Sequence, residues 1–402
     1  MNKNTLIVWF VLMLSGLSGI ATPLFAQEGL QPRSQAMRVL RANPDISLNG
    51  LFSVGYFSES DHLQFGAHDP ATRGFTLQNL ELSFTSVVDP FFRAEAHLIF
   101  GLEDGESFLE VEEAHMTTTG LPYGLQVMAG QFFTRFGRKN KQHPHAWQFI
   151  DQTIINTLMF GGDGLRNLGV QVSTLLPLPF YFELIGSVQN AKGETASSFL
   201  SSSEESFAGR PILDQTINEG NDLLYMGGLK TSFDVNETIT SVVGTSHLFG
   251  SNGTGLDTRT RIHGIDFFIK WKPTLAHSGW PFLILQGEAM QRSYQAGAAL
   301  VDGSLLLRET FKTEGHYIQT LYGFKRQWVA GLRYGAANAT DPSDPRTGDR
   351  WRISPNLTFY PSEFSKIRFQ YNYDRSDERK DPIHAVFLQY EFSIGAHAAH
   401  TF

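Results

Sequence analysis

The chain has 402 residues, and its 32 lysines and arginines against 40 aspartates and glutamates give a net charge of −8. This acidic balance argues against a partner made of nucleic acid. There is no cysteine, so an exported form of the chain could not use disulfide bonds and would depend on burial and backbone pairing.

Residues 1–26 have the layout of a secretory signal peptide. Lys3 supplies a positive charge, an apolar stretch follows, and small residues precede Gln27. The apolar stretch is too short to span a bilayer comfortably, and its position suits a cleaved export signal. A buried N-terminal helix is the alternative. Residues 27–45 are then predicted to be a short periplasmic lead, too small for a plug domain.

The remaining chain alternates polar and apolar residues with a period of two. In Lys366–Tyr373 every even position is polar and every odd position is apolar, mostly aromatic. In a strand these two sets face opposite sides, which in a membrane barrel are the lumen and the lipid. No further apolar run approaches the ~20 residues that a membrane helix needs. If the chain spans a membrane, it must therefore do so as a closed barrel.

Sixteen segments carry this alternation, an even number that suits a bacterial barrel. In chain order they are 46–57, 75–86, 91–101, 107–117, 124–132, 167–174, 180–189, 223–232, 237–249, 260–271, 282–294, 314–323, 326–335, 349–358, 364–374 and 383–393. The twelfth is the least certain, because residues 304–312 could replace or extend it.

Connections between the segments alternate in length. Those after even-numbered segments are short and rich in turn residues, such as Val88-Asp89-Pro90. Most of those after odd-numbered segments are longer, namely 58–74, 133–166, 190–222, 295–313 and 336–348. Short periplasmic turns alternating with long outer loops are typical of outer-membrane barrels. The predicted fold is an all-β, transmembrane, up-and-down antiparallel barrel of about sixteen strands over 46–393, without a plug, followed by a tail at 394–402.

The loop 133–166 is the candidate constriction of the pore. It combines basic residues with Trp147, Phe149 and the apolar stretch Ile154–Phe160. Such a stretch needs a surface on which to pack, and the inner barrel wall is available, so we predict that the loop folds into the lumen. An outer lid that packs on neighbouring loops is the alternative.

Charges in and around this loop predict an attraction for anions. Arg135, Arg138, Lys139 and Lys141 fall within seven positions, and charges in a narrow, partly dehydrated pore act more strongly than in bulk water. Further candidate solute-binding residues are Asp151, Arg166, Arg93, Glu95, Arg350, Arg352, Lys366 and Arg368. The alternative for the strand residues is that they pair with one another and only solvate the lumen.

Two histidines in the loop are candidate metal ligands. Imidazoles such as those of His143 and His145 suit Zn²⁺, Cu²⁺ and Ni²⁺. A site needs three or four converging ligands, and Asp151 or Asp163 could complete one if the loop folded back.

No cofactor is predicted. The chain has no G-x-S-x-G, H-E-x-x-H or phosphate-loop motif, so no enzymatic activity is expected.

The same loop carries a resemblance to a known family. The motifs are Phe136-Gly137-Arg138, His143–Asp151, Gly161–Arg166, Gly169–Ser173 and Leu176-Pro177. They resemble outer-membrane proteins related to the phosphate-selective porin O/P family, some of which are labelled zinc-regulated TonB-dependent outer-membrane receptors. The resemblance implies phosphate or zinc as a solute. The chain has no room for a plug and a 22-stranded barrel, and its lumen mixes basic with acidic residues.

These observations together predict a porin. We expect a bacterial outer-membrane channel with a periplasmic N-terminus that passes small hydrophilic solutes by diffusion, with a preference for anions. The alternatives are an uptake component or a receptor for metal, zinc or a metal chelate. The expected partners are outer-membrane lipid, small solutes or ions, the barrel assembly machinery and two further copies in a homotrimer.

Overall fold

The computed structural model describes residues 44–60, 63–103, 105–202, 206–276, 279–338 and 348–395. The predicted signal peptide, residues 27–43 of the lead and residues 396–402 of the tail lie outside the described residues. In the described part of the chain, no helix is long and apolar enough to cross a membrane.

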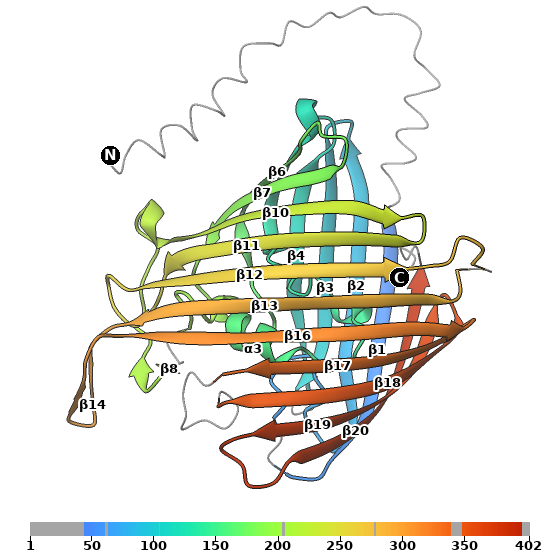
Figure 1. Ribbon diagram of the computed structural model, residues 1–402. Helices are drawn as coiled ribbons and strands as arrows, with labels where there is room; N and C mark the ends of the chain where they lie inside the picture. Colours follow the sequence, from blue (N-terminus) through green and yellow to red (C-terminus); the bar gives the residue numbers. More distant parts are fainter. Residues whose placement is uncertain are drawn as a thin grey trace, which may run out of the picture. The chain divides into compact units, whose positions relative to one another are not determined.

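Sixteen antiparallel strands form a closed barrel, in which each strand pairs with its neighbour and the last pairs with the first (Figure 1). The barrel strands are β1 (Asp45–Phe57), β2 (Gly74–Asp89), β3 (Phe92–Glu103), β4 (Glu106–Thr118), β5 (Leu125–Phe133), β6 (Arg166–Leu175), β7 (Tyr181–Asn190), β10 (Leu223–Asn236), β11 (Ile239–Ser251), β12 (Arg259–Trp271), β13 (Phe282–Ala296), β16 (Glu309–Lys325), β17 (Trp328–Ala337), β18 (Arg350–Ser362), β19 (Ser365–Ser376) and β20 (Ile383–Gly395). The predicted fold class and all sixteen predicted strands are confirmed.

The twelfth barrel strand, β16, differs most from its predicted range. It begins at Glu309, five residues before the predicted start, so part of the 304–312 alternative extends it. The small elements outside the barrel wall are the hairpins β8 (Ser206–Phe207) with β9 (Arg210–Pro211) and β14 (Ala299–Val301) with β15 (Ser304–Leu306), the helix α3 (Ile154–Phe160), and 3₁₀ turns at Pro122–Gly124, Pro144–Ala146, Glu194–Ala196 and Gly220–Asp222.

Strand alternation sorts the wall into two faces of opposite character. In β18 the side chains of Arg352, Ser354 and Thr358 are buried, whereas those of Ile353 and Leu357 are exposed. In this strand polar side chains thus point into the barrel and apolar ones point out. This is the arrangement of a barrel that spans lipid around a polar lumen.

Aromatic rings gather on the outer face near both ends of the strands. Toward the long connections, the rings of Tyr334, Trp351 and Tyr373 follow one another with centroid distances of 6.4 and 5.4 Å. Toward the short turns, the rings of Trp328 and Phe359 stack at 4.7 Å. Aromatic girdles at the two membrane interfaces have this placement.

The apolar core lies inside the barrel. Helix α3 packs against β16 and β17, and its buried residues share a cluster with inward-facing side chains such as Ile185 and Met290. The 190–222 connection adds Phe199, which is fully buried. Arg210 donates a hydrogen bond to the carbonyl oxygen of Gly297 at 2.9 Å, which ties this connection to the one after β13.

Candidate functional site

The candidate site is built around residues 134–165, which join β5 to β6 and are called the inner segment below. Lys230 Nζ donates to the carbonyl oxygen of Gly137 at 2.6 Å, and the amide of Ile150 donates to Gln370 Oε1 at 2.8 Å. Lys230 lies on β10 and Gln370 on β19. The inner segment is therefore held by wall strands that are far apart in the barrel order.

Local features of the sequence shape the inner segment. The side-chain amide of Asn140 joins the two ends of the segment. Its Nδ2 donates to the carbonyl oxygens of Thr134 and Leu165 at 2.8 and 2.9 Å, and its Oδ1 accepts from the backbone amide of Leu165 at 2.9 Å. Gly137 has a φ of 58°, and a Cβ there would lie 2.3 Å from Glu288 Oε2. A glycine is required at this point, because any side chain would meet both backbone strain and that carboxylate.

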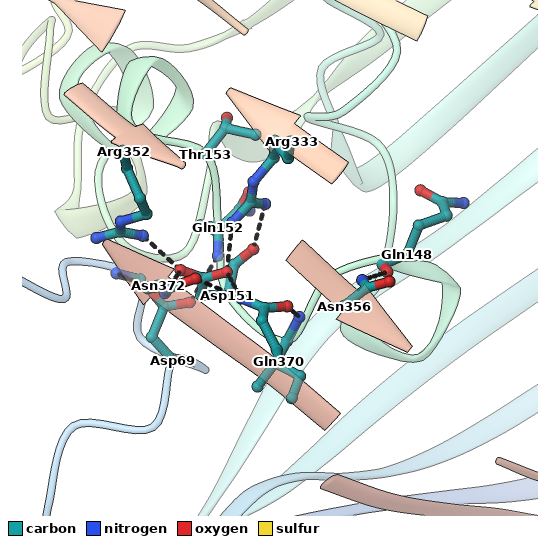
Figure 2. A network of polar contacts seen from close by, with 12 residues as sticks. Asp69, Gln148, Asp151, Gln152, Thr153, Arg333, Arg352, Asn356, Gln370 and Asn372 are labelled. Carbon is teal, nitrogen blue, oxygen red and sulfur yellow. Dashed lines mark hydrogen bonds and ion pairs between the residues drawn. The ribbon is translucent and has the colours of Figure 1, made fainter. Parts of the chain in front are cut away.

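Asp151 is the centre of a buried ion-pair network inside the barrel (Figure 2). Its carboxylate pairs with Arg333 of β17 and Arg352 of β18, and it accepts hydrogen bonds from Gln370 Nε2 at 2.7 Å and Asn372 Nδ2 at 2.8 Å. Burial raises the pKa of Asp151, but the two guanidinium groups lower it more strongly and hold it well below its usual range. The inner segment thus presents a stable anion to the arginines of the wall.

The network extends on both sides of Asp151. Arg350 and Arg352 both bond to Asp374 of β19, each with an atom pair at 2.6 Å. On the other side lies Asp69, from the connection between β1 and β2, and its carboxylate accepts from the backbone amide of Gln152 at 2.8 Å. Burial and the neighbouring charge of Asp151 raise the pKa of Asp69 to about 6.

Docking of residues 63–73, in the connection between β1 and β2, onto the inner segment is expected to depend on pH through Asp69. The folded-state pKa of about 6 exceeds the ordinary aspartate pKa of 3.8, so the stabilisation is complete below about pH 4 and is lost as the pH rises through 6. The free energy of docking changes by up to about 3 kcal/mol between these two pH limits. Amide hydrogen exchange at Gly66 and Gln152, corrected for its intrinsic rate, should be slower at pH 5 than at pH 7. D69N should remove the difference, and equal protection at both pH values in the unmodified protein would refute this role.

Lys141 is the exposed member of the basic group in the inner segment. Enclosure by the barrel, followed by the positive charges of Lys230, Arg135 and Arg138, lowers its pKa to about 8. Arg135 forms a two-bond contact with Glu183 of β7, at 2.8 and 2.9 Å. The region around Lys141 therefore has an excess of positive charge.

The other two basic residues of the segment contact aromatic rings. The guanidinium carbon of Arg138 lies 4.2 Å from the ring centroid of Phe268, and Lys139 Nζ lies 4.0 Å from that of Trp147. Lys139 is buried, and burial together with the charge of Arg333 holds its pKa well below the usual range. Lys139 is consequently a poorer source of positive charge than Lys141.

The remaining predicted solute-binding residues lie on strands and are engaged with protein partners. Their ion pairs are Arg93–Glu95 at 2.7 Å, Arg166–Glu110 and Lys366–Glu391 at 2.6 Å. Arg368 donates to the carbonyl oxygen of Trp147 at 3.0 Å and to Gln389 Oε1 at 3.1 Å. Arg368 therefore fixes the inner segment to β19, and Lys366 does the same through the carbonyl oxygen of His145 at 2.7 Å.

The two predicted metal ligands lie in a group of imidazoles and carboxylates at the β2–β4 wall. We call Glu81, His97, Glu112, Glu113, His143 and His145 the histidine–glutamate cluster. His143 Nδ1 lies 2.7 Å from Glu112 Oε2, and His143 Nε2 lies 2.8 Å from Glu113 Oε2. Burial lowers the pKa of His143, but the carboxylates of Glu112 and Glu81 raise it more strongly, to well above the usual range.

The metal candidates need one correction. Asp151 is wrong as a completing ligand, because it is engaged with Arg333 and Arg352. Instead, Glu81, His97 and His143 each offer a ligand atom, and these atoms lie within 4.8 Å of one another. His145 lies beside the group, with its Nδ1 2.9 Å from Glu81 Oε2.

The sequence does not mark His97, Glu112 or Glu113 as candidate ligands. His97 stands on the inward face of a segment in which polar and apolar residues alternate, so its direction into the barrel was predictable. Glu112 and Glu113 are neighbours in sequence and would normally face opposite sides. A register shift between β3 and β4 at this point turns both of them to the interior, and such a bulge leaves no clear mark in the sequence.

A known protein sequence is similar to this chain over most of its length. No protein-family model matches the chain. An uncharacterized protein of Aquifex aeolicus (strain VF5) is 34% identical over an alignment of 396 residues, and the match covers 89% of this chain and 80% of the relative.

Several solved structures share the fold. The anion-selective porin from Comamonas acidovorans has a TM-score of 0.52 at 10% identity, with 88% of this chain and 100% of that chain covered. The outer membrane channel DcaP of Acinetobacter baumannii scores 0.53 at 14% identity, covering 88% and 98%. Pseudomonas putida OprB scores 0.51 at 10% identity, covering 90% and 96%. The chain therefore belongs to the same family as the Aquifex aeolicus protein, and it has the sixteen-stranded fold of outer-membrane porins.

Proposed function

We propose that this protein is a porin of a bacterial outer membrane, through which small hydrophilic solutes diffuse. The observation that carries the proposal is a closed barrel whose polar interior is narrowed by a segment fixed to its walls at Lys230, Glu288 and Gln370. An inward-folded segment of this kind leaves a limited cross-section in which charges act at short range. The apolar outer face with its two aromatic girdles suits contact with lipid.

Anions are the preferred solutes in this proposal. Lys141 is exposed among Lys230, Arg135 and Arg138. The opposing acidic residues are Glu183, which acts on Lys141, and Asp266 and Glu288, which act on Lys230. Phosphate, which the family resemblance implies, would contact the basic residues around Lys141. It would not contact a row of unpaired arginines along the barrel wall. The reason is that Arg350 and Arg352 are bonded to aspartates.

Conductance measurement tests both parts of the proposal. The full chain without its predicted signal peptide is refolded, reconstituted in planar bilayers and studied under a KCl gradient. Stepwise conductance and a reversal potential displaced toward that of chloride are expected. Absence of channels from preparations that show a folded barrel would overturn the porin proposal. Cation preference would overturn only the role of the basic group around Lys141.

A second candidate function is uptake or reception of a divalent metal or its chelate, which the histidine–glutamate cluster favours. In that case the metal is cargo and passes the cluster in transit. Flux of a radioactive zinc isotope into liposomes distinguishes this function from passive passage of chloride or phosphate. Zinc flux that does not exceed the flux of a similarly sized inert cation would exclude it.

A homotrimer is expected from the architecture. Ala94, Ala96, Ala114 and Ala129 place four small side chains beside Met116 on the outer face of β3–β5, where a second barrel could approach closely. The barrel assembly machinery remains the expected partner during insertion.

A further inference from the structure

Three elements converge at the histidine–glutamate cluster. Glu81 comes from β2, His97 from β3 and His143 from the inner segment. Their ligand atoms lie within 4.8 Å of one another, and His97 Nδ1 is 3.1 Å from Glu81 Oε1. Glutamate oxygen and histidine nitrogen are ligands that Zn²⁺ and related divalent ions accept, and three protein ligands are enough for a metal site that keeps an open position.

The cluster is richer in carboxylates than its cationic surroundings explain. Glu81 and Glu112 are 0% and 1% exposed. The guanidinium of Arg166 lies 4.0 Å from Glu112, and the other close contacts of the two carboxylates are mainly to imidazoles. A buried carboxylate is costly unless it meets a cation. A divalent ion would supply that charge without requiring several imidazoles to be protonated together.

The surroundings also have the arrangement that orients metal-bound histidines. His143 contacts a carboxylate through each ring nitrogen, at 2.7 and 2.8 Å. If one nitrogen turned to an ion, the other could keep its glutamate, which is the carboxylate–histidine–metal arrangement that fixes the tautomer of a ligand. Ser83 Oγ donates to Glu81 Oε1 at 2.8 Å and would hold that carboxylate in place in the same way.

We propose that Glu81, His97 and His143 bind one divalent transition-metal ion of the zinc class, which fixes the inner segment to the β2–β3 wall. The ion is resident and does not need to travel through the barrel. The site therefore does not depend on channel activity, and binding and conductance can succeed or fail separately. Bound metal crosslinks residues that are far apart in sequence, so it should hold the inner segment more firmly in place.

The test measures metal binding to the refolded, metal-free full chain. Titration with Zn²⁺ against a chelator of known affinity should show one site per chain, and Co²⁺ should give the visible absorption of a low-symmetry site. E81Q, H97Q and H143Q should each lower the Zn²⁺ affinity tenfold or more. E112Q, which changes only a partner of His143, should lower it less. Mg²⁺ should not compete.

A matched control is available on the other side of the barrel. His247 and His263 lie on the outer face of β11 and β12, with their Nδ1 atoms 2.7 Å apart. The H247Q/H263Q variant removes two imidazoles and should leave the affinity unchanged. Heat-modifiable migration on gels confirms that each variant retains a folded barrel. The proposal is overturned if the folded protein binds no stoichiometric Zn²⁺, or if binding survives in E81Q and H97Q.

Discussion

D151N is expected to release the inner segment from the wall and to destabilise the barrel by about 3–5 kcal/mol. The substitution removes the anion that pairs with both Arg333 and Arg352, and it leaves Arg333 buried without that charge. Urea unfolding of the protein in lipid vesicles, followed by tryptophan fluorescence, measures the loss. In planar bilayers the same variant should show larger and noisier currents, because the segment that narrows the lumen has lost its anchor.

Two comparisons keep the D151N result interpretable. D234N changes an exposed aspartate near the end of β10, beside the turn to β11, and its stability should stay within about 0.5 kcal/mol of the parent. Adding R333Q to D151N removes one stranded cation and should restore part of the lost stability, because Arg352 keeps its contact with Asp374. A D151N protein with the parent's unfolding midpoint and conductance would contradict the anchoring role.

K141E is expected to reduce anion selectivity strongly or to reverse it. The substitution changes the local charge by two units at an exposed position in the inner segment. Two unit charges about 8 Å apart at an effective dielectric constant of about 40 interact by roughly 1 kcal/mol. Each unit of charge should therefore change the permeability of the anion and that of the cation about fivefold in opposite directions, which changes the ratio of anion to cation permeability about 25-fold. The reversal potential under a salt gradient measures this ratio.

The controls for K141E separate location from charge. K141R keeps the charge and should behave like the parent protein. K325E makes the same charge change at an exposed residue at the end of β16, beside a short turn, and should have little effect. If K325E and K141E shift the reversal potential equally, the selectivity reflects the overall charge of the molecule and not the constriction.

The wall of the barrel could be predicted from the sequence because its signal is local. In β19 the alternation of Lys366, Arg368 and Gln370 with apolar, mostly aromatic residues fixes both the element and its two faces. The start of β16 was harder to place, since residues 309–313 are largely polar on both faces. Outside the part of a strand that faces lipid, the outward residues are polar as well, so the alternation of polar and apolar residues that marks a strand disappears.

The contacts of the inner segment were not accessible in this way. Its composition indicated that it needs a packing surface, but nothing near Asp151 specifies Arg333 or Arg352, which lie about 200 positions away. A basic residue on an inward face is equally compatible with a free and with a paired charge. The same limit applied to the metal candidates, where His143 could be found by its residue type but its partners on β2 and β3 could not.

The pairing of β1 with β20 has a consequence for the order of folding. The inner segment is made in the first half of the chain, yet the strands that hold Asp151 are β17, β18 and β19. Contacts with such large sequence separation form slowly, because the intervening chain must first be brought together. Once β20 meets β1 the ring is complete, and the inner segment can no longer enter from the side. Docking of Asp151 and closure of the ring are thus expected to be late and simultaneous steps, and a chain that stops before β17 would achieve neither.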